Sequence, residues 1–177
     1  MLDGFGMSEL GSVTCMPVDD METVKKKAGS CGVPLLVTQL RIVDDNGEDV
    51  PQGEVGELYL RSPTIGPGYW NRPDATKETR TPDGWFKTGD AGRLDEEGFL
   101  YLVDRLKDMY ISGGENVYPA EVEAAIAEMA GIGDVAVIGV PDEKWGETGV
   151  AYVVSAAGKP EGAALTPQAV SDHCRAR

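Results

Sequence analysis

The stretch DGWFKTGDAGRLDEEGFLYLVDRLKDMYISGGENVYPAEVE, residues 83–123, changes its hydrophobic period partway along. Its first half favours strands, because 99–103 and 109–112 are short apolar runs bounded by turn residues. From Pro119 onward, apolar residues recur at helical spacing, and proline suits the first turn of a helix. The segment 104–108 separates the two patterns, so we expect a domain boundary there.

On the N-terminal side of this stretch the signals are those of strands and loops. Residues 1–33 are rich in turn residues, whereas 33–44 and 54–61 alternate apolar and polar residues. Asn46-Gly47 between these two runs is typical of a tight turn, which predicts an antiparallel pair. The segment 62–83 contains four prolines and is predicted to be a loop.

On the C-terminal side the pattern becomes β-α-β-β-α. Residues 134–140 and 149–155 are predicted strands, and 156–162 is a linker of small residues. Thr166-Pro167 opens a second helix that stops mid-pattern at Arg177. We therefore expect the polypeptide to continue beyond these 177 residues in nature.

Composition excludes several classes of protein. The chain has 16 Lys and Arg against 30 Asp and Glu, and a net charge of −14 argues against binding to duplex nucleic acid or to an anionic membrane. No apolar run approaches the roughly 18–20 residues of a transmembrane helix, and the N-terminus does not resemble a signal peptide. Three scattered cysteines, Cys15, Cys31 and Cys174, and the single His173 argue against a disulfide framework or a zinc site. A reduced, cytoplasmic protein is predicted.

Four clusters combine glycine or charge with polar side chains. Residues 4–9 (GFGMSE) offer an aromatic ring, a hydroxyl and a carboxylate, which suit a planar base, a phosphate and a hard cation. The carboxylate in 87–90 (KTGD) suits a vicinal diol. The run 104–108 (DRLKD) is densely charged, and the glycines of 112–116 (SGGEN) permit close approach of a ligand. Taken singly, a flexible terminus, a turn aspartate, a solvated loop and a plain turn explain them equally well.

In their order and spacing, the four clusters resemble the adenylate-forming superfamily of acyl- and aryl-CoA synthetases, luciferase and peptide-synthetase adenylation domains. Three further stretches strengthen the resemblance: 53–76 (GEVGELYLRSPTIGPGYWNRPDAT), the whole of 83–123, and 137–147 (VIGVPDEKWGE). The segments 107–123 and 141–147 are most similar to fatty-acyl or medium-chain acyl-CoA ligases.

The resemblance implies a nucleotide site. Phe5 corresponds to the aromatic residue that stacks on adenine, Ser8 to a hydroxyl near the α-phosphate, and Glu9 to the carboxylate facing Mg²⁺. Asp90 corresponds to the carboxylate that binds the ribose diol, and Arg105 to the arginine that reaches ribose and phosphate. ATP or AMP and Mg²⁺ are therefore the implied ligands.

The resemblance also implies a pivot and a coenzyme A site. Lys107 stands at the hinge position, where the family has Asp or Lys. Gly113 and Gly114 correspond to the segment that lines the pantetheine tunnel, and Trp145 to a residue near CoA. Gly6 and Met7 would lie near the acyl carboxylate.

Two family elements do not occur among these 177 residues. The Ser/Thr/Gly-rich phosphate loop belongs upstream of this region, and the C-terminal catalytic lysine follows a motif that runs from Pro to Gly-Lys, a context that Lys159 does not have. The resemblance therefore implies a fragment. Residues 1–104 would be the end of the large AMP-binding domain, and 105–177 would be most of the small C-terminal domain.

The fold class expected is α+β, with a β-rich, barrel-like subdomain followed by a small α+β domain. The function expected of the parent is that of an ATP-dependent acyl-CoA synthetase, which converts an acid to acyl-AMP and then to acyl-CoA, with the isolated fragment inactive. Two alternatives stay open: a non-catalytic nucleotide-binding or interaction module, and a ligase that loads a carrier protein instead of CoA. Acyl chain length and oligomeric state are not predicted.

Overall fold

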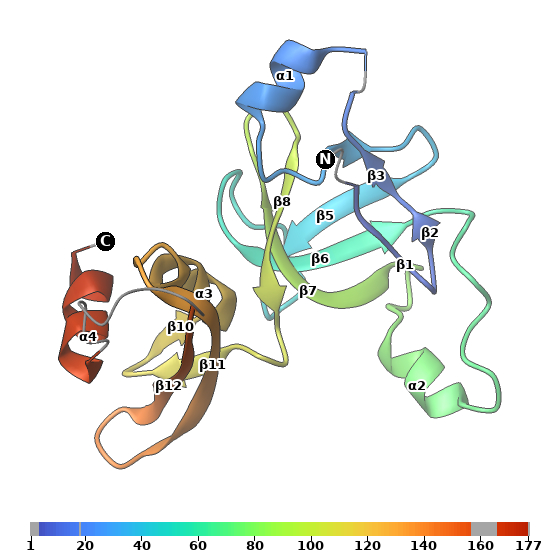
Figure 1. Cartoon of the computed structure of the whole chain (residues 1–177). Coiled ribbons are helices and arrows are strands. Elements are labelled where there is room, and N and C mark those ends of the chain that lie inside the picture. The colour runs from blue at the N-terminus through green and yellow to red at the C-terminus, as the bar shows by residue number, and fades with distance from the viewer. Residues whose placement is uncertain (1–3, 18, 157–165, 177) are drawn as a thin grey trace. The chain divides into compact units, whose positions relative to one another are not determined.

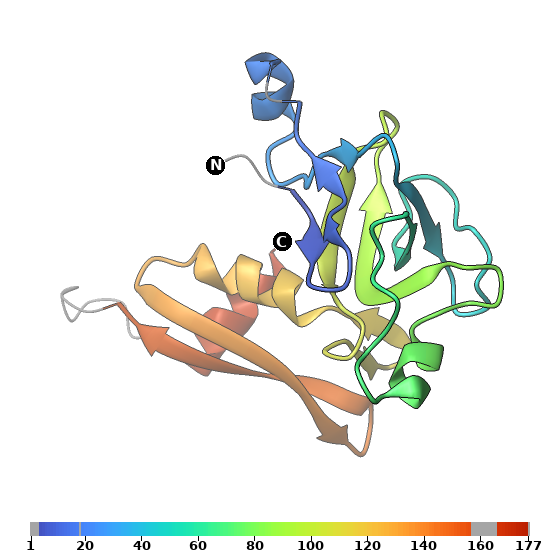
Figure 2. The ribbon, with the colours of Figure 1, turned by 90° about the vertical axis from the view of Figure 1, so that its right-hand side faces the viewer.

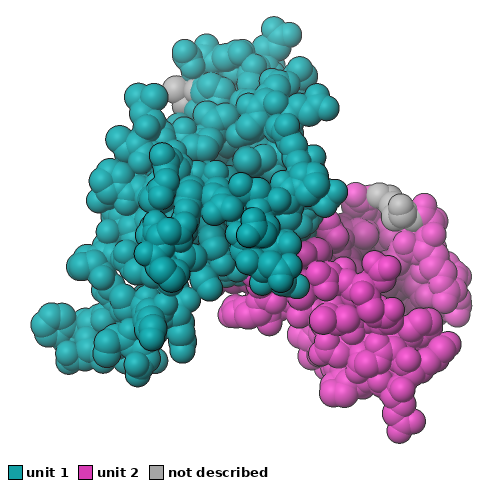
Figure 3. All heavy atoms as spheres, turned by 180° about the vertical axis from the view of Figure 1, so that it is seen from behind, with its two compact units in different colours: residues 1–103 teal, residues 104–177 magenta. Residues whose placement is uncertain are grey.

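The computed structural model describes residues 4–17, 19–156 and 166–176, which fold as two compact units, Met1–Val103 and Asp104–Arg177. Figure 3 colours the two units separately. Each unit has its own sheet and its own apolar core, so each is described by itself. Most of the linker expected at 156–162, and Lys159 with it, lies outside the described residues.

The first unit contains short strands and helices around one larger sheet (Figure 1). In chain order its elements are β1 (Gly6–Met7), β2 (Gly11–Ser12), β3 (Thr14–Cys15), α1 (Met21–Lys26), β4 (Val33–Pro34), β5 (Gln39–Val43), β6 (Gly56–Arg61), α2 (Pro73–Glu78), β7 (Phe86–Leu94) and β8 (Leu100–Arg105). The last two residues of β8 belong to the second unit.

The main sheet of the first unit has the order β5-β6-β7-β8. Strands β5 and β6 are antiparallel, with Leu40 opposite Leu60 and Ile42 opposite Leu58, which confirms the predicted pair. The order ends at β5 on one side and β8 on the other, so the sheet is open. This corrects the barrel-like expectation for the part of the chain that the structure describes, while the α+β class is confirmed.

The core of this unit follows from alternation along β6. Leu58 and Leu60 are completely buried, and they cluster with Ile42, Phe86 and Leu100. Burying a leucine side chain stabilises a fold by about 1.5–3 kcal/mol, so these few residues account for much of the sheet's stability.

Three elements of the first unit differ from the predictions. Strand β7 has nine residues where the sequence indicated only a short apolar pair at 85–86. Helix α2 lies inside the predicted loop 62–83, and α1 lies inside the turn-rich segment 1–33. Both helices have six residues, too few for a periodic apolar pattern to be visible.

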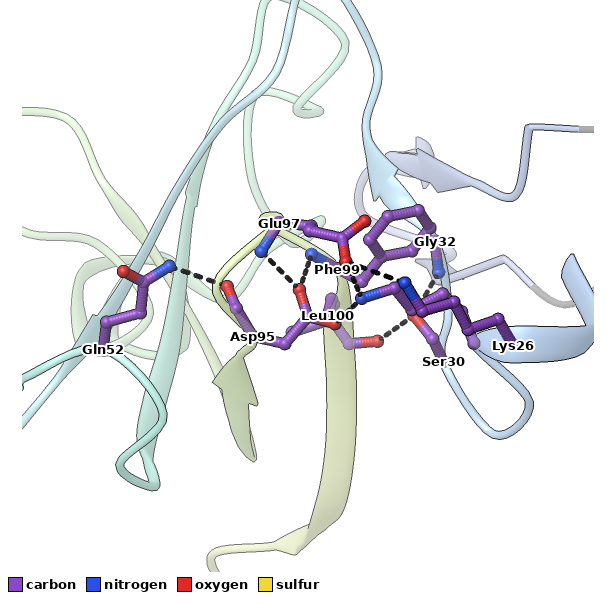
Figure 4. Close-up of polar contacts among 9 residues, drawn as sticks. Lys26, Ser30, Gly32, Gln52, Asp95, Glu97, Phe99 and Leu100 are labelled. Atoms are coloured by element: carbon purple, nitrogen blue, oxygen red, sulfur yellow. Dashed lines mark hydrogen bonds and ion pairs between the residues drawn. The ribbon is translucent and has the colours of Figure 1, made fainter. Parts of the chain in front are cut away.

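The end of α1 is tied to the turn between β7 and β8 by a part-buried cluster of one lysine and two carboxylates. Lys27 Nζ lies 2.7 Å from Asp95 Oδ2 and 2.9 Å from Glu97 Oε1, and 4.9 Å from the centre of the Phe99 ring. Figure 4 shows the two carboxylates on the turn, with Ser30 Oγ donating to the Leu100 carbonyl beside them. This cluster joins residues about 70 positions apart in the chain.

The pKa values in this cluster shift in the directions that pairing requires. Hydrogen bonds to Asp95 and Glu97 raise the pKa of Lys27, and the bond from Lys27 lowers the pKa of Glu97. Burial by itself would raise the pKa of Asp95, but hydrogen bonds from Lys27 and from the Phe99 and Glu97 amides outweigh it and lower that pKa.

The second unit is a sheet with two helices. Its elements are β9 (Tyr110–Ser112), β10 (Glu115–Val117), α3 (Pro119–Ala127), β11 (Ile132–Asp142), β12 (Gly146–Ser155) and α4 (Pro167–Arg175). The strand order is β10-β9-β12-β11, and β11 and β12 form the long antiparallel hairpin seen in Figure 2. Both predicted helices and the strands predicted at 109–112, 134–140 and 149–155 are present.

The core of the second unit is centred on Tyr110, Ile126 and Val137, with α4 adding Val170 and Cys174. Two glycines make room for Tyr110: a Cβ at Gly139 would lie 2.4 Å from the Tyr110 Cβ, and one at Gly149 would lie 2.2 Å from its hydroxyl. Burial raises the pKa of Tyr110.

Two further features of the described residues are the state of the cysteines and the lengths of the helices. Cys15, Cys31 and Cys174 form no disulfide. Among the described residues the longest helices have nine residues, and none is long and apolar enough to cross a bilayer.

Candidate functional site

Phe5 is held by a tight hairpin at the start of the first unit. Its amide donates to Thr14 Oγ1 at 2.8 Å, and its carbonyl accepts from the amides of Val13 and Thr14 at 2.9 and 3.2 Å. Phe5 as a whole residue is 9% exposed, and it clusters with Leu10 in the core. The segment 4–14 is therefore an ordered hairpin, and only a small part of the Phe5 ring is accessible for the predicted stacking.

Glu9 lies at the tip of this hairpin, with its side chain bound from elsewhere in the unit. Tyr69 donates its hydroxyl to Glu9 Oε1 at 2.8 Å, and the Gly66 amide donates to the Glu9 carbonyl at 2.9 Å. The hydrogen bond to Glu9 raises the pKa of Tyr69, so the phenol remains protonated and is a donor. Ser8, the neighbouring predicted site residue, is exposed.

Tyr69 is a residue that the sequence reasoning missed. Its amide donates to Thr76 Oγ1 at 2.9 Å, which ties it to α2. The approach is close at Gly68, where a Cβ would lie 2.5 Å from Thr76 Cγ2. The signal was present in GYW at 68–70, within a stretch used for the resemblance, but nothing in the sequence indicated its spatial relation to Glu9.

The residues around Glu9 fit a magnesium ion only as part of a complex with phosphate. In the described ranges no group of three His, Cys, Asp or Glu side chains could hold a metal. Mg²⁺ commonly binds one or two carboxylates together with substrate phosphates, and Glu9 is suited to be one such ligand.

Asp90 lies within β7, so the alternative of a turn aspartate is wrong. Its side chain is buried, its amide donates to Thr88 Oγ1 at 3.1 Å, and Thr88 in turn donates to the Leu58 carbonyl at 2.8 Å. The adjacent Gly89 has a φ of +73° and donates its amide to Glu57 Oε1 at 3.2 Å. Burial raises the pKa of Glu57. Asp90 is thus held on the sheet in a rigid position.

Arg105 and Lys107 lie at the start of the second unit. Arg105 ends β8 with an exposed side chain, and its carbonyl accepts from the amides of Asp108 and Met109 at 3.0 and 3.3 Å. Lys107 occupies the turn that these bonds close, and its side chain is 70% exposed, 4.0 Å from Asp108.

Gly113 and Trp145, two of the residues predicted to contact CoA, lie against each other. The Gly113 amide donates to the Trp145 carbonyl at 2.8 Å, and a Cβ on Gly113 would lie 2.9 Å from the indole Cε3. Asp142 Oδ1 fixes the hairpin turn by accepting from the amides of Lys144 and Trp145. Gly114, at a φ of +91°, has open space at its Cβ position.

Within each unit, then, some predicted residues come together. Gly6 and Met7 form β1, paired with Gly11 and Ser12 beside Phe5. The two glycines and Trp145 share one end of the second unit's sheet. The roles predicted for all of these residues stay predictions.

Models of known protein families match parts of both units. Residues 1–70 match the model of the AMP-binding enzyme family, and residues 121–177 match that of the AMP-binding enzyme C-terminal domain. The chain is 48% identical to a feruloyl-CoA synthase of Amycolatopsis sp over 157 residues, which are 89% of this chain and 31% of that protein. It is 46% identical to the long-chain-fatty-acid–CoA ligase FadD13 of Mycobacterium tuberculosis, over 88% of this chain and 30% of the relative.

A solved structure shows the same fold. The crystal structure of ATP-bound MatB from Rhodopseudomonas palustris superposes with a TM-score of 0.89 at 35% identity, over 100% of this chain and 34% of MatB. The chain thus spans about a third of the length of the proteins it matches. With both family models matched in order along it, the chain belongs to the adenylate-forming, AMP-binding enzyme family.

Proposed function

We propose that the protein containing this chain is an ATP-dependent acid–thiol ligase, an acyl-CoA synthetase. A carboxylate attacks the α-phosphate of ATP and releases pyrophosphate, which leaves acyl-AMP. The thiol of CoA then attacks the acyl carbonyl and releases AMP. The observation that supports this most is the match to feruloyl-CoA synthase and FadD13, at 48% and 46% identity across nearly nine-tenths of the chain.

In this proposal the first unit contributes to adenylation. Asp90, which lies within β7, accepts hydrogen bonds from the ribose hydroxyls. Each such charge-assisted hydrogen bond stabilises the complex by about 1.5–3 kcal/mol. Phe5 presents its accessible part to adenine, and Ser8 lies near the α-phosphate. Glu9, oriented by Tyr69, is the carboxylate for Mg²⁺, which when bound neutralises phosphate charge.

The second unit contributes to thioester formation. Arg105 reaches ribose and phosphate, and Lys107 is the pivot about which the part of the unit that follows it rotates between the half-reactions. Gly113, Gly114 and Trp145 line the path of the pantetheine arm. The exposed indole, held on Gly113, offers an apolar surface for it.

We further propose that the acid is a fatty acid and that the protein is cytoplasmic. The similarity to FadD13 supports a fatty acid as the substrate. The similarity to feruloyl-CoA synthase, which is named for an aromatic acid, means that the class of acid has to be tested. The three cysteines, none of which is in a disulfide, support the proposed cytoplasmic location.

The test uses the complete protein that contains this chain. Acid-dependent exchange of pyrophosphate into ATP is measured with ferulic acid and with fatty acids of several lengths, and product formation is then measured with free CoA and with a phosphopantetheine carrier protein. We expect exchange with a fatty acid and thioester formation with free CoA. Exchange without any CoA thioester would favour the carrier protein, and no exchange with any acid would contradict the proposal. The 177-residue chain alone, which has no phosphate loop, serves as the inactive control.

A further inference from the structure

Asp104 accepts backbone hydrogen bonds at both of its carboxylate oxygens. Oδ2 accepts from the Ala120 amide at 2.9 Å, and Oδ1 accepts from the Arg105 amide at 2.7 Å. The first contact spans 16 residues and joins the end of β8 to the first turn of α3. Both residues belong to the second unit.

Helix α3 has no cap from its own N-terminal residue. Tyr118 is the N-cap and makes no side-chain capping bond, and Pro119 has no N–H. The Ala120 amide is therefore one of the donors that a helix start leaves without an intrahelical partner. A carboxylate at this position also interacts favourably with the helix dipole. Asp104 thus caps α3 from outside the helix.

The same residue begins the turn that contains Lys107. Arg105, which follows Asp104, closes this turn by accepting from Asp108 and Met109. Beside the turn is a cavity of about 360 Å³ lined by nine residues, among them Asp104, Lys107, Asp108 and Glu123. The turn therefore has space on the side that faces α3.

We propose that Asp104 is a positioning residue, whose bond to Ala120 latches the Lys107 turn onto α3 and must open when the chain rotates about Lys107. Asp104 precedes Lys107 and Ala120 follows it, so a large change in the backbone dihedrals of Lys107 alone moves the two apart. The bond then belongs to one of the two rotational states. The proposal that the bond opens rests on the proposed function, because the rotation about Lys107 is part of that function. The hydrogen bond itself does not depend on it.

The latch is tested first in the 177-residue chain, by native-state cleavage with trypsin after Arg105 and Lys107. Asp104→Ala is compared with Thr166→Ala, which removes the cap of α4, where Thr166 Oγ1 accepts from Ala169 at 3.2 Å. Rates are divided by those of the unfolded variants, so that the changed neighbour of Arg105 does not bias them. Cleavage of a locally opened segment tracks the open population.

We expect Asp104→Ala to accelerate cleavage at the turn about tenfold or more, as loss of a charge-assisted bond implies. Thr166→Ala should change it less than about twofold, and Asp104→Asn, which keeps an acceptor, should restore much of the protection. Equal acceleration in Asp104→Ala and Thr166→Ala would reduce Asp104 to an ordinary stabilising cap, and unchanged cleavage in Asp104→Ala would overturn the latch. If Asp104→Ala does not fold, Asp104→Asn carries the test: loss of the charge should still accelerate cleavage at the turn about twofold or more, and unchanged cleavage would overturn the latch.

The second measurement uses the complete enzyme and the ratio of its two half-reactions. Asp104→Ala should change the ratio of thioester formation to adenylation at least about threefold, because it alters the balance between rotational states. Asp104→Asn should bring the ratio back toward the original value. If Asp104→Ala left the ratio of thioester formation to adenylation unchanged, the bond between Asp104 and Ala120 would have no part in the rotation. The trypsin result needs no substrate, so a failure of the proposed function is distinguishable from a failure of the latch.

Discussion

The amide of Gly113 donates to the carbonyl of Trp145 at 2.8 Å, and the indole ring lies where a Cβ on that glycine would point. The contact joins the turn between β9 and β10 to the turn between β11 and β12. Position 113 requires glycine for two reasons. Its φ is +61°, in the left-handed region, and a Cβ would lie 2.9 Å from the indole Cε3.

Gly113→Ala should therefore lower the free energy of unfolding of the second unit by about 1–3 kcal/mol. Gly114→Ala is the matched control, because its φ is also positive, at +91°, but its Cβ would meet nothing within 4 Å. The control should lose only about 1 kcal/mol. Denaturant melts measure both. If Trp145→Ala does not reduce the cost of Gly113→Ala in a double-mutant cycle, the steric account is wrong.

Lys27→Met should lower the melting temperature at neutral pH and lose this effect in acid. The lowered pKa values of Asp95 and Glu97 mean that both carboxylates contribute stability above their unfolded values of 3.8 and 4.5. That contribution disappears as the pH falls through the lowered folded values. The difference in melting temperature between the two proteins should therefore shrink as the pH falls from 7 to 3.

Lys26→Met provides the control for this pair. Lys26 lies 3.6 Å from Glu97, but both side chains are largely exposed, so its removal should hardly change the melting temperature. A difference between the Lys27 variant and the original protein that stays constant from pH 7 to pH 3 would show that the lysine acts through packing alone.

Asp90→Ala, in the complete protein, should weaken ATP binding by about 1.5–3 kcal/mol if the buried carboxylate accepts the ribose hydroxyls. Calorimetric titration with ATP and thermal melting are measured on the same preparation. A purely structural Asp90 predicts a lower melting temperature with unchanged affinity of the folded protein.

Tyr69→Phe removes only the hydroxyl that donates to Glu9. In the complete protein we expect a several-fold rise in the Mg²⁺ concentration that gives half-maximal pyrophosphate exchange, because Glu9 loses its orienting partner. Tyr152→Phe, an exposed position on β12, is the control. Equal Mg²⁺ dependence in the two variants would exclude a positioning role for Tyr69.

Local patterns predicted the elements that have strong local signals. Asn46-Gly47 between two alternating runs was enough to predict the β5–β6 pair, and Pro119 followed by helical spacing was enough for α3. Strand β7 has the sequence FKTGDAGRL, with two glycines and an aspartate, residues that disfavour strands. It is a strand because β6 pairs with it, which a local pattern cannot reveal.

The residues of the candidate site also fall into those that the sequence identified and those that it did not. Motifs located Glu9, Asp90 and Lys107 as candidates, because the spacing of their clusters lies in the sequence. Tyr69 and Asp104 were not identified as partners, because the contacts of Tyr69 with Glu9 and of Asp104 with Ala120 span 60 and 16 residues and depend on how the loops fold back.

We propose that the complete protein carries out its two half-reactions by rotating about Lys107, and Lys107→Pro in that protein tests the proposal most directly. Proline fixes φ near −65° and removes the amide proton, so it holds the pivot in one state. Pyrophosphate exchange and thioester formation from preformed acyl-AMP are measured separately on the same enzyme. We expect exchange to survive within about tenfold and thioester formation to fall much further, with the proline favouring the adenylating state. Equal losses in both half-reactions with a lower melting temperature, or unchanged rates in both, would contradict the account.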